Sequence, residues 1–138
     1  GERALQDAGV DASEIGFMVN TSVCRDYIEP ATGVIVHSNL GLPATAGTFD
    51  LSNACLGFLN GMLLIADMIE LGQIEAGLVV SAEGVREGQI KTMERLLSNP
   101  PDMMAFRENL ATFTLGSGSV AMVLTHKQKS KTGKRGTC

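Results

Sequence analysis

Cys55 is the side chain in this sequence whose position best suits covalent chemistry. It follows the turn-forming residues Ser52-Asn53-Ala54 and precedes a long apolar run, so it is expected in the first turn of a helix. Unpaired backbone N–H groups and the positive end of the helix dipole favour the thiolate there, and the thiolate is the nucleophilic form of cysteine. A free cysteine is also among the most buried residue types and then acts as a small hydrophobic side chain. The residues alone therefore leave both roles open.

The elements that hold Cys55 are a short strand before it and a long helix after it. The strand is expected over Thr48–Leu51 and the helix over Leu56–Leu71, with Gly72 as the stop signal. The polar residues of this helix fall on one narrow side, so apolar residues or glycine occupy most of its circumference. Such a helix is covered on nearly every side, which predicts that another subunit or a further half of the protein packs against it.

The segments around this unit alternate between strands and helices. Near-continuous apolar runs predict buried strands at Ile15–Val23 and Gly77–Ala82. Helices are predicted at Glu2–Val10 and at Ala31–Leu40, the second with Pro30 at its first position. This order predicts an α/β fold, namely a mainly parallel sheet with helices on both faces.

The region after the second buried strand is expected to leave the sheet and then return to it. Glu83–Asn109 is polar, and a proline-containing turn within it divides two amphipathic pieces, Gln89–Leu97 and Met103–Leu110. A glycine-rich turn, Leu115–Ser119, then leads into a last strand at Val120–Thr125.

Composition and charge exclude several function classes. Residues 1–126 are expected to form one domain, incomplete at both ends, and residues 127–138 a basic, disordered tail. The chain has 15 acidic and 11 basic residues, and five of the basic residues lie in that tail, so nucleic-acid binding is not indicated. Three cysteines without metal-ligand spacing, and no signal peptide, favour a reducing, cytoplasmic location. The apolar run Leu56–Leu71 is too short and too interrupted for a membrane span.

Three stretches of the sequence together resemble one enzyme family. They are Asn20–Pro30 (NTSVCRDYIEP), Phe49–Met62 (FDLSNACLGFLNGM) and Thr114–Met122 (TLGSGSVAM). They are similar to thiolase-fold condensing enzymes of the 3-oxoacyl-ACP synthase III type. Within that type they resemble the olefin-biosynthesis enzymes, which join two fatty acyl-CoA molecules by non-decarboxylative Claisen condensation. The resemblance covers residues 1–125 and implies a thiolase-like fold, represented here by its N-terminal half.

The resemblance also implies roles for individual residues. Cys55 matches the nucleophile that accepts the acyl group as a thioester. Glu29 matches a glutamate that reaches into the partner subunit's active site and acts as the base on the second acyl chain. Gly116 and Gly118 match a glycine turn near the nucleophile, where small residues permit tight backbone approach. The implied substrates are acyl-CoA or acyl-ACP, the implied assembly is a homodimer, and no cofactor or metal is implied.

The family's catalytic histidine and asparagine come from a second half of the protein, which is expected to be missing here. Neither His37 nor His126 replaces that histidine by motif, and both are expected at the surface. Cys24 follows a predicted strand and is expected to pack in the core. Cys138 is expected to be an incidental terminal thiol.

Two alternatives to an acyl-transferring enzyme can be weighed from the sequence. The first is a dimerisation or binding module that keeps the fold but lacks turnover, and formation of an acyl adduct distinguishes it from an enzyme. The second is a cysteine hydrolase with an α/β-hydrolase elbow, which has glycine two residues before and two after the nucleophile. Gly57 fills the second place, but Asn53 occupies the first, so the elbow is disfavoured.

Overall fold

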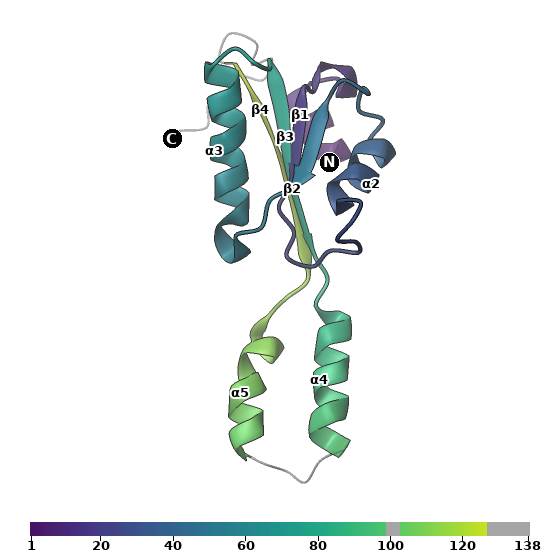
Figure 1. Ribbon diagram of the computed structural model, residues 1–138, viewed down its shortest axis with the longest axis vertical. Coiled ribbons are helices and arrows are strands. Elements are labelled where there is room, and N and C mark those ends of the chain that lie inside the picture. The colour runs from purple at the N-terminus through teal and green to yellow at the C-terminus, as the bar shows by residue number, and fades with distance from the viewer. Residues whose placement is uncertain (99–102, 127–138) are drawn as a thin grey trace.

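The computed structural model describes residues 1–98 and 103–126 (Figure 1). Its helices are α1 (Glu2–Ala8), α2 (Thr32–Asn39), α3 (Gly57–Glu70), α4 (Arg86–Ser98) and α5 (Met103–Thr114). Its strands are β1 (Phe17–Asn20), β2 (Gly47–Asp50), β3 (Ala76–Glu83) and β4 (Gly118–Thr125). Two short 3-10 turns are η1 (Ala12–Glu14) and η2 (Ala54–Leu56). The predicted tail, 127–138, and the predicted turn between α4 and α5 lie outside the described residues.

The four strands form one sheet in the order β2-β1-β3-β4. β1 pairs in parallel with both β2 and β3, which confirms the mainly parallel sheet. β4 pairs antiparallel to β3 along all of its residues. The cause is the connection between them: α4 leads the chain away from the sheet and α5 leads it back to the same end, so β4 must run opposite to β3 (Figure 1).

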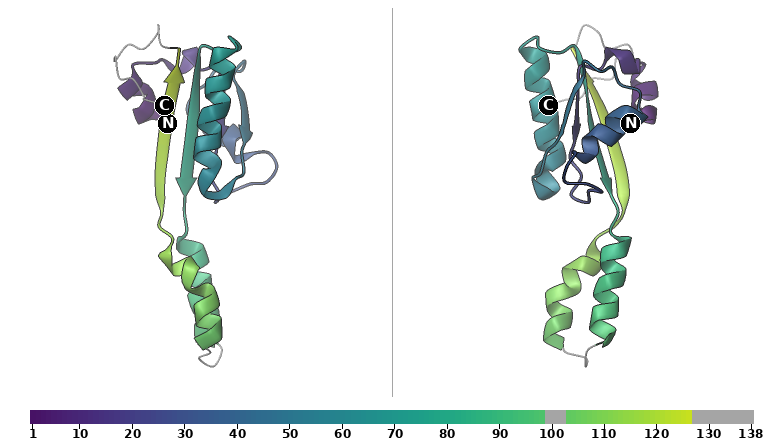
Figure 2. Two further views of the ribbon diagram at one scale, coloured as in Figure 1. Left: turned by 90° about the vertical axis from the view of Figure 1, so that its left-hand side faces the viewer. Right: turned by 45° about the vertical axis from the view of Figure 1, so that its right-hand side comes forward.

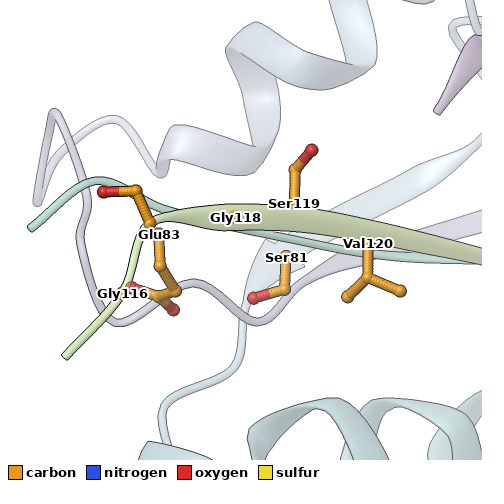
Figure 3. Close-up of a pocket in the computed structure, with 7 residues that line it drawn as sticks. Ser81, Glu83, Gly116, Gly118, Ser119 and Val120 are labelled. Carbon is orange, nitrogen blue, oxygen red and sulfur yellow. The ribbon is translucent and has the colours of Figure 1, made fainter. Parts of the chain in front are cut away.

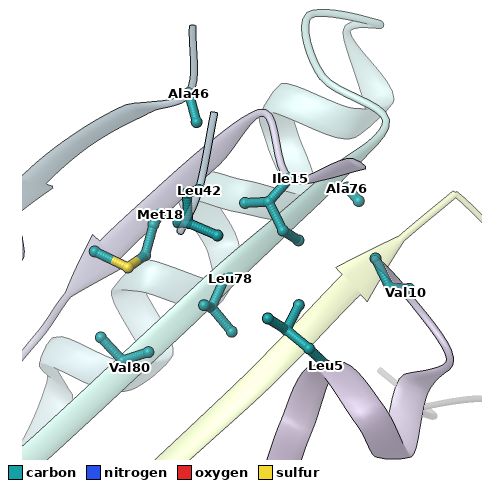
Figure 4. Close-up of a cluster of buried hydrophobic side chains, with 9 residues drawn as sticks. All are labelled: Leu5, Val10, Ile15, Met18, Leu42, Ala46, Ala76, Leu78 and Val80. Atoms are coloured by element: carbon teal, nitrogen blue, oxygen red, sulfur yellow. The ribbon is translucent and has the colours of Figure 1, made fainter. Parts of the chain in front are cut away.

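Helices cover both faces of the sheet, as the sequence predicts (Figure 1). Successive strand residues point to opposite faces, so Met18 belongs to one core and Val19 to the other. The first core packs the sheet against α1 and the segment around α2, and its nine buried side chains are drawn in Figure 4. In the second core Val19 and Val79 pack against Ile65 and Ile69 of α3. The α/β prediction is therefore confirmed.

α3 is covered on one side only by the residues that the structure describes. Ile65 and Ile69 face the sheet and are buried, whereas Leu59 and Leu63 remain 54% and 62% exposed. The helix begins at Gly57, one residue later than expected, because the 3-10 turn η2 precedes it. A cover for the exposed apolar face, by a second subunit or a further half, stays a prediction.

Two glycines allow α3 to approach the sheet closely. A Cβ atom at Gly61 would lie 2.9 Å from Val79 Cγ1 and 3.0 Å from Thr21 Cγ2. A Cβ atom at Gly57 would lie 3.3 Å from the carbonyl oxygen of Thr21. Both glycines are buried, and their spacing of four residues places them on the same face of the helix. These two glycines therefore fix how closely the N-terminal end of α3, and with it the turn that carries Cys55, approaches β3 and the residue that follows β1.

Gly61→Ala is expected to lower the free energy of unfolding, whereas Gly88→Ala is expected to raise it. Alanine gains about 1 kcal/mol of helix propensity at either position. At Gly88, in α4, the new Cβ meets nothing within 4 Å, so this gain is kept. At Gly61 the clash with the branched side chains of Val79 and Thr21 costs about 1–3 kcal/mol. Urea denaturation of both variants measures the difference, and a Gly61→Ala protein as stable as Gly88→Ala would contradict it.

α4 and α5 form the predicted excursion away from the sheet (Figure 2). Both helices run longer than the expected amphipathic pieces, and neither contains a buried residue. Their apolar side chains, such as Met93 and Phe106, are 48% and 44% exposed. Among the described residues, no helix is long and apolar enough to cross a membrane.

Candidate active site

Cys55 lies in the short turn that joins the sheet to α3. β2 ends at Asp50, and the 3-10 turn Ala54–Leu56 carries Cys55 immediately before the first residue of α3. The thiol is exposed. The structure places Cys55 in the 3-10 turn directly ahead of α3, where the sequence predicts the first turn of the helix itself.

The backbone beside Cys55 is strained. Ala54 has a φ of 43°, and it is the one described residue other than glycine with a positive φ. A left-handed conformation costs an L-residue with a Cβ roughly 1–2 kcal/mol, and such strain concentrates at functional sites. The turn is held by a hydrogen bond from the Asn53 side-chain amide to Asn60 on α3, and by the buried Gly57 against β1. A sharp, supported turn thus presents the thiol to solvent.

Glu29 lies on the loop between β1 and α2. The loop from Val23 to Pro30 is exposed throughout, and the Glu29 carboxylate forms no hydrogen bond or ion pair with any described residue. No hydrogen bond joins Glu29 to Cys55 within the described part of the chain. Pro30 does not occupy the first helical position, because α2 begins at Thr32 with Ala31 as its N-cap. The carboxylate therefore faces outward from this chain.

Glu83, the last residue of β3, holds the beginning of this loop. Its carboxylate accepts hydrogen bonds from the backbone N–H groups of Val23 at 2.7 Å and Cys24 at 3.0 Å. Burial raises the pKa of Glu83. These two bonds, together with bonds from the side chains of Cys24 and Ser81, lower the pKa by more than burial raises it, so the net pKa lies below 4.5. Glu83 thus stays ionised at neutral pH and ties the loop to β3.

The stabilisation that Glu83 provides is expected to disappear in acid. The folded-state pKa is lower than the unfolded value, so the contribution is fully present above the unfolded pKa and is lost as the pH falls through the folded pKa. Urea unfolding of the unmodified protein and of Glu83→Gln between about pH 3 and pH 7 measures it. The difference in unfolding free energy should be constant near neutrality and should shrink below the unfolded pKa. A difference that grows in acid would contradict the assignment.

Asp50, the last residue of β2, holds the other end of the same loop. Its side chain is 5% exposed and accepts hydrogen bonds from the backbone N–H groups of Thr32 at 2.9 Å and Gly33 at 2.8 Å. It thereby caps the N-terminal end of α2 from a distant strand. Asn20 at the end of β1 donates a further bond at 2.8 Å. Asp50 therefore joins β1, β2 and the start of α2.

Arg25 connects the loop to the turn that carries Cys55. Its guanidinium lies 3.7 Å from the Asp50 carboxylate and donates a hydrogen bond to the hydroxyl of Ser52. Ser52 is three residues before Cys55 in the chain. The loop with Glu29 and the turn with Cys55 are thus tied to one another through Arg25.

Sequence reasoning missed Asp50 and Glu83 as parts of the site. The sequence patterns indicate Asp50 only as part of the predicted strand Thr48–Leu51, and Glu83 only as the start of the polar segment Glu83–Asn109. Both are carboxylates at the carboxyl ends of the two parallel strands that flank β1, where polar side chains meet at one edge of a sheet. That position was the signal available in the sequence.

The start of β4 forms a shallow pocket beside Glu83 (Figure 3). Ser81 and Glu83 of β3 line it together with residues 116–120, and its volume is about 350 Å³. Added Cβ atoms at Gly116 and Gly118 would meet nothing within 4 Å among these residues. The tight backbone approach expected at these glycines is therefore not formed within the described chain.

None of the remaining candidate side chains in the described ranges hydrogen-bonds Cys55. Cys24 is exposed and hydrogen-bonds Glu83, so the expectation that it packs in the core is wrong: the loop has already left the sheet at this point. His37 is half-buried, and one of its ring nitrogens lies 3.2 Å from the carbonyl oxygen of Ala46. His126 is exposed, as expected. Cys138 lies outside the described residues. Within residues 1–98 and 103–126, no group of three side chains could ligate a metal ion.

Residues 49–89 match the family described as 3-oxoacyl-[acyl-carrier-protein (ACP)] synthase III. A curated relative, the acyl-CoA:acyl-CoA alkyltransferase of Shewanella oneidensis, is 47% identical over 89% of this chain and 35% of its own length. The beta-ketoacyl-[acyl-carrier-protein] synthase III of Rhodospirillum rubrum is 33% identical over 88% of this chain and 33% of its own length. The chain thus spans about a third of these relatives.

Solved structures of Xanthomonas campestris OleA have the same fold as this chain. One, a variant bound with cerulenin, superposes with a TM-score of 0.91 at 43% identity, covering 95% of this chain and 39% of that one. Another, with a glutamate replaced by glutamine, superposes with a TM-score of 0.89 at 44% identity, covering 92% and 39%. The matched region of the family model includes the end of β2, the whole turn around Cys55, α3 and β3.

Proposed function

Because this chain is a thiolase-fold relative of the 3-oxoacyl-ACP synthase III family, we propose that Cys55 accepts an acyl group from acyl-CoA or an acyl carrier protein. The observation that carries the proposal is the exposed thiol on a strained turn at the start of α3, within the segment that matches the family. The Cys55 thiolate adds to the thioester carbonyl carbon. The tetrahedral adduct then expels the CoA or carrier thiolate, which takes up the proton that Cys55 lost. The product is an acyl-Cys55 thioester.

In the second step Glu29 serves as the general base. It removes a proton from the α-carbon of a second acyl thioester, and the resulting carbanion adds to the carbonyl carbon of acyl-Cys55. This addition forms the carbon–carbon bond, and collapse of the tetrahedral adduct then breaks the bond to sulfur and releases the Cys55 thiolate, while Glu29 passes its proton to solvent. The product is a 3-oxoacyl thioester, so the reaction class is a non-decarboxylative Claisen condensation.

The proposed assembly is a homodimer in which Glu29 serves the Cys55 of the partner chain. Two observations support it: the Glu29 carboxylate faces outward on an exposed loop, and the apolar face of α3 around Leu59 and Leu63 is uncovered by this chain. Light scattering at micromolar concentration measures the assembly, and a monomer would contradict it.

Acylation by palmitoyl-CoA tests the proposed function. Intact-protein mass spectrometry is expected to show the addition of one palmitoyl group, and hydroxylamine is expected to remove it, since the bond is a thioester. Free palmitate is the matched control because it lacks the activated thioester. A protein that stays unmodified at high palmitoyl-CoA would contradict the proposal and would leave the alternative, a dimerisation or binding module without turnover.

A further inference from the structure

The loop that carries Glu29 follows the inner strand β1, and carboxylates from the two strands that flank β1 hydrogen-bond its two ends. β1 leads into the loop, and β3 and β2 flank β1 on either side. Glu83 at the end of β3 binds the loop where it begins, at Val23 and Cys24. Asp50 at the end of β2 binds the chain where the loop enters α2, at the N–H groups of residues 32 and 33. Each carboxylate thus receives two backbone N–H groups.

Few other contacts hold the loop between the hydrogen bonds of Glu83 and those of Asp50. All eight of its side chains from Val23 to Pro30 are exposed, so no core packing holds it. Within it, Arg25 contacts Asp50 and Ser52, and Tyr27 exchanges hydrogen bonds with the side chain of Thr32 at 3.1 and 3.3 Å. Glu29 lies beyond Tyr27, and its carboxylate has no hydrogen bond or ion pair with any residue that the structure describes. The position of its carboxylate therefore depends on how the ends of the loop are fixed.

We propose that Glu83 and Asp50 are positioning residues for Glu29, holding the two ends of its loop so that the carboxylate is presented at one place. This inference rests on the proposed role of Glu29 as the base of the condensation step. Hydrogen bonds from N–H groups to a carboxylate are stronger than those between neutral groups, which suits them to hold an exposed loop. Acylation of Cys55 does not use Glu29, so its rate should not depend on the hydrogen bonds of Glu83 or Asp50.

Glu83→Gln is the variant that tests the inference with least harm to the core. Glutamine keeps the length of the side chain and one acceptor oxygen, but it places an NH₂ group against one of the two backbone N–H groups. Glu83 is only half-buried, whereas Asp50 is almost fully buried and caps α2, so the Glu83 variant is better suited to remain folded. Glu70→Gln, an exposed carboxylate at the end of α3, is the matched control.

The experiment measures two rates on the full chain. The first is formation of acyl-Cys55 from palmitoyl-CoA, and the second is formation of the 3-oxoacyl product from the acylated protein. Glu83→Gln is expected to leave the first rate unchanged and to slow the second by about 10- to 100-fold, because displacing a catalytic group by about 1 Å costs about that much. Glu70→Gln should alter neither rate. Equal slowing of both steps by Glu83→Gln, or of neither, would overturn the inference.

A double-mutant cycle with Glu29→Gln separates positioning from a general loss of stability. If Glu83 acts through Glu29, the protein with both substitutions condenses no more slowly than Glu29→Gln alone. If the two effects multiply, Glu83 acts independently of Glu29 and the inference is wrong. Asp50→Asn provides the second variant, with the same expected pattern.

The loop itself gives a readout that needs no turnover. In ¹⁵N-resolved hydrogen exchange, the amides of Val23 and Cys24 should be protected in the unmodified protein and should exchange faster in Glu83→Gln. If Cys55 is not acylated, or if no condensation occurs, the proposed function fails, and this exchange alone decides whether Glu83 holds the loop. Unchanged protection in the variant would overturn the inference whatever the chemistry of Cys55.

Discussion

Cys55→Ala is expected to abolish the covalent acyl adduct completely. Thioester exchange needs a thiolate, and alanine offers no nucleophile in the turn before α3. The neighbouring groups cannot substitute: the Ser52 hydroxyl accepts a hydrogen bond from Arg25, and a hydroxyl at its ordinary reactivity is a far weaker nucleophile than a thiol. Intact-protein mass spectrometry after incubation with palmitoyl-CoA measures the loss.

Cys24→Ala is the matched control for this prediction. Cys24 is also exposed, but it hydrogen-bonds Glu83 and lies on the loop after β1, not in a turn that leads into a helix. The Cys24→Ala protein should therefore still take up one acyl group per chain. An adduct that persists in Cys55→Ala, or that disappears in Cys24→Ala, would contradict the prediction that Cys55 is the acylated residue.

Asp50→Ala is expected to cost about 3–5 kcal/mol of unfolding free energy, because the buried carboxylate accepts several hydrogen bonds at once and a bond to a charged group contributes about 1.5–3 kcal/mol. The substitution leaves the N–H groups of Thr32 and Gly33, the amide of Asn20 and the guanidinium of Arg25 without their acceptor. Because small domains are stable by only about 5–15 kcal/mol, the loss is a large share of the total.

Urea unfolding followed by circular dichroism measures the effect of Asp50→Ala. Asp67→Ala is the control, since Asp67 is exposed on α3 and such surface substitutions stay within about 0.5 kcal/mol. A similar loss of unfolding free energy in both variants would show that the hydrogen bonds of Asp50 do not stabilise the fold more than an exposed carboxylate does.

The order of elements was predictable because local periodicity specifies it. The alternation of apolar runs, glycine stops and turn residues placed β2 and α3 almost at their observed bounds. The direction of β4 was not predictable in this way. A strand shows the same apolar pattern whether it runs parallel or antiparallel, and only the way in which α4 and α5 return the chain decides between them.

The site was predictable in its residue types and only partly in its surroundings. The position of Cys55 between a strand and a helix could be inferred from neighbouring residues, but its exposure depends on the conformation of Ala54, which a sequence pattern does not specify. The hydrogen bonds of Glu83 and Asp50 to the loop were missed because they join side chains to backbone N–H groups 60 and 18 residues away in the sequence. The position of each carboxylate at a strand end was the one signal in the sequence, and no local pattern identifies the distant backbone N–H groups that it binds.

The helical excursion divides the molecule into parts of unequal stability. β3 and β4 pair over their full length, and β3 contributes Leu78 to one core and Val79 to the other, whereas α4 and α5 bury no residue. The helices can therefore open locally without disturbing the ladder. A protease that cuts between α4 and α5 would then produce two fragments that stay associated through β3 and β4. The fold thus contains a natural place to split the protein into complementing halves, with Glu29 and Cys55 together on the first.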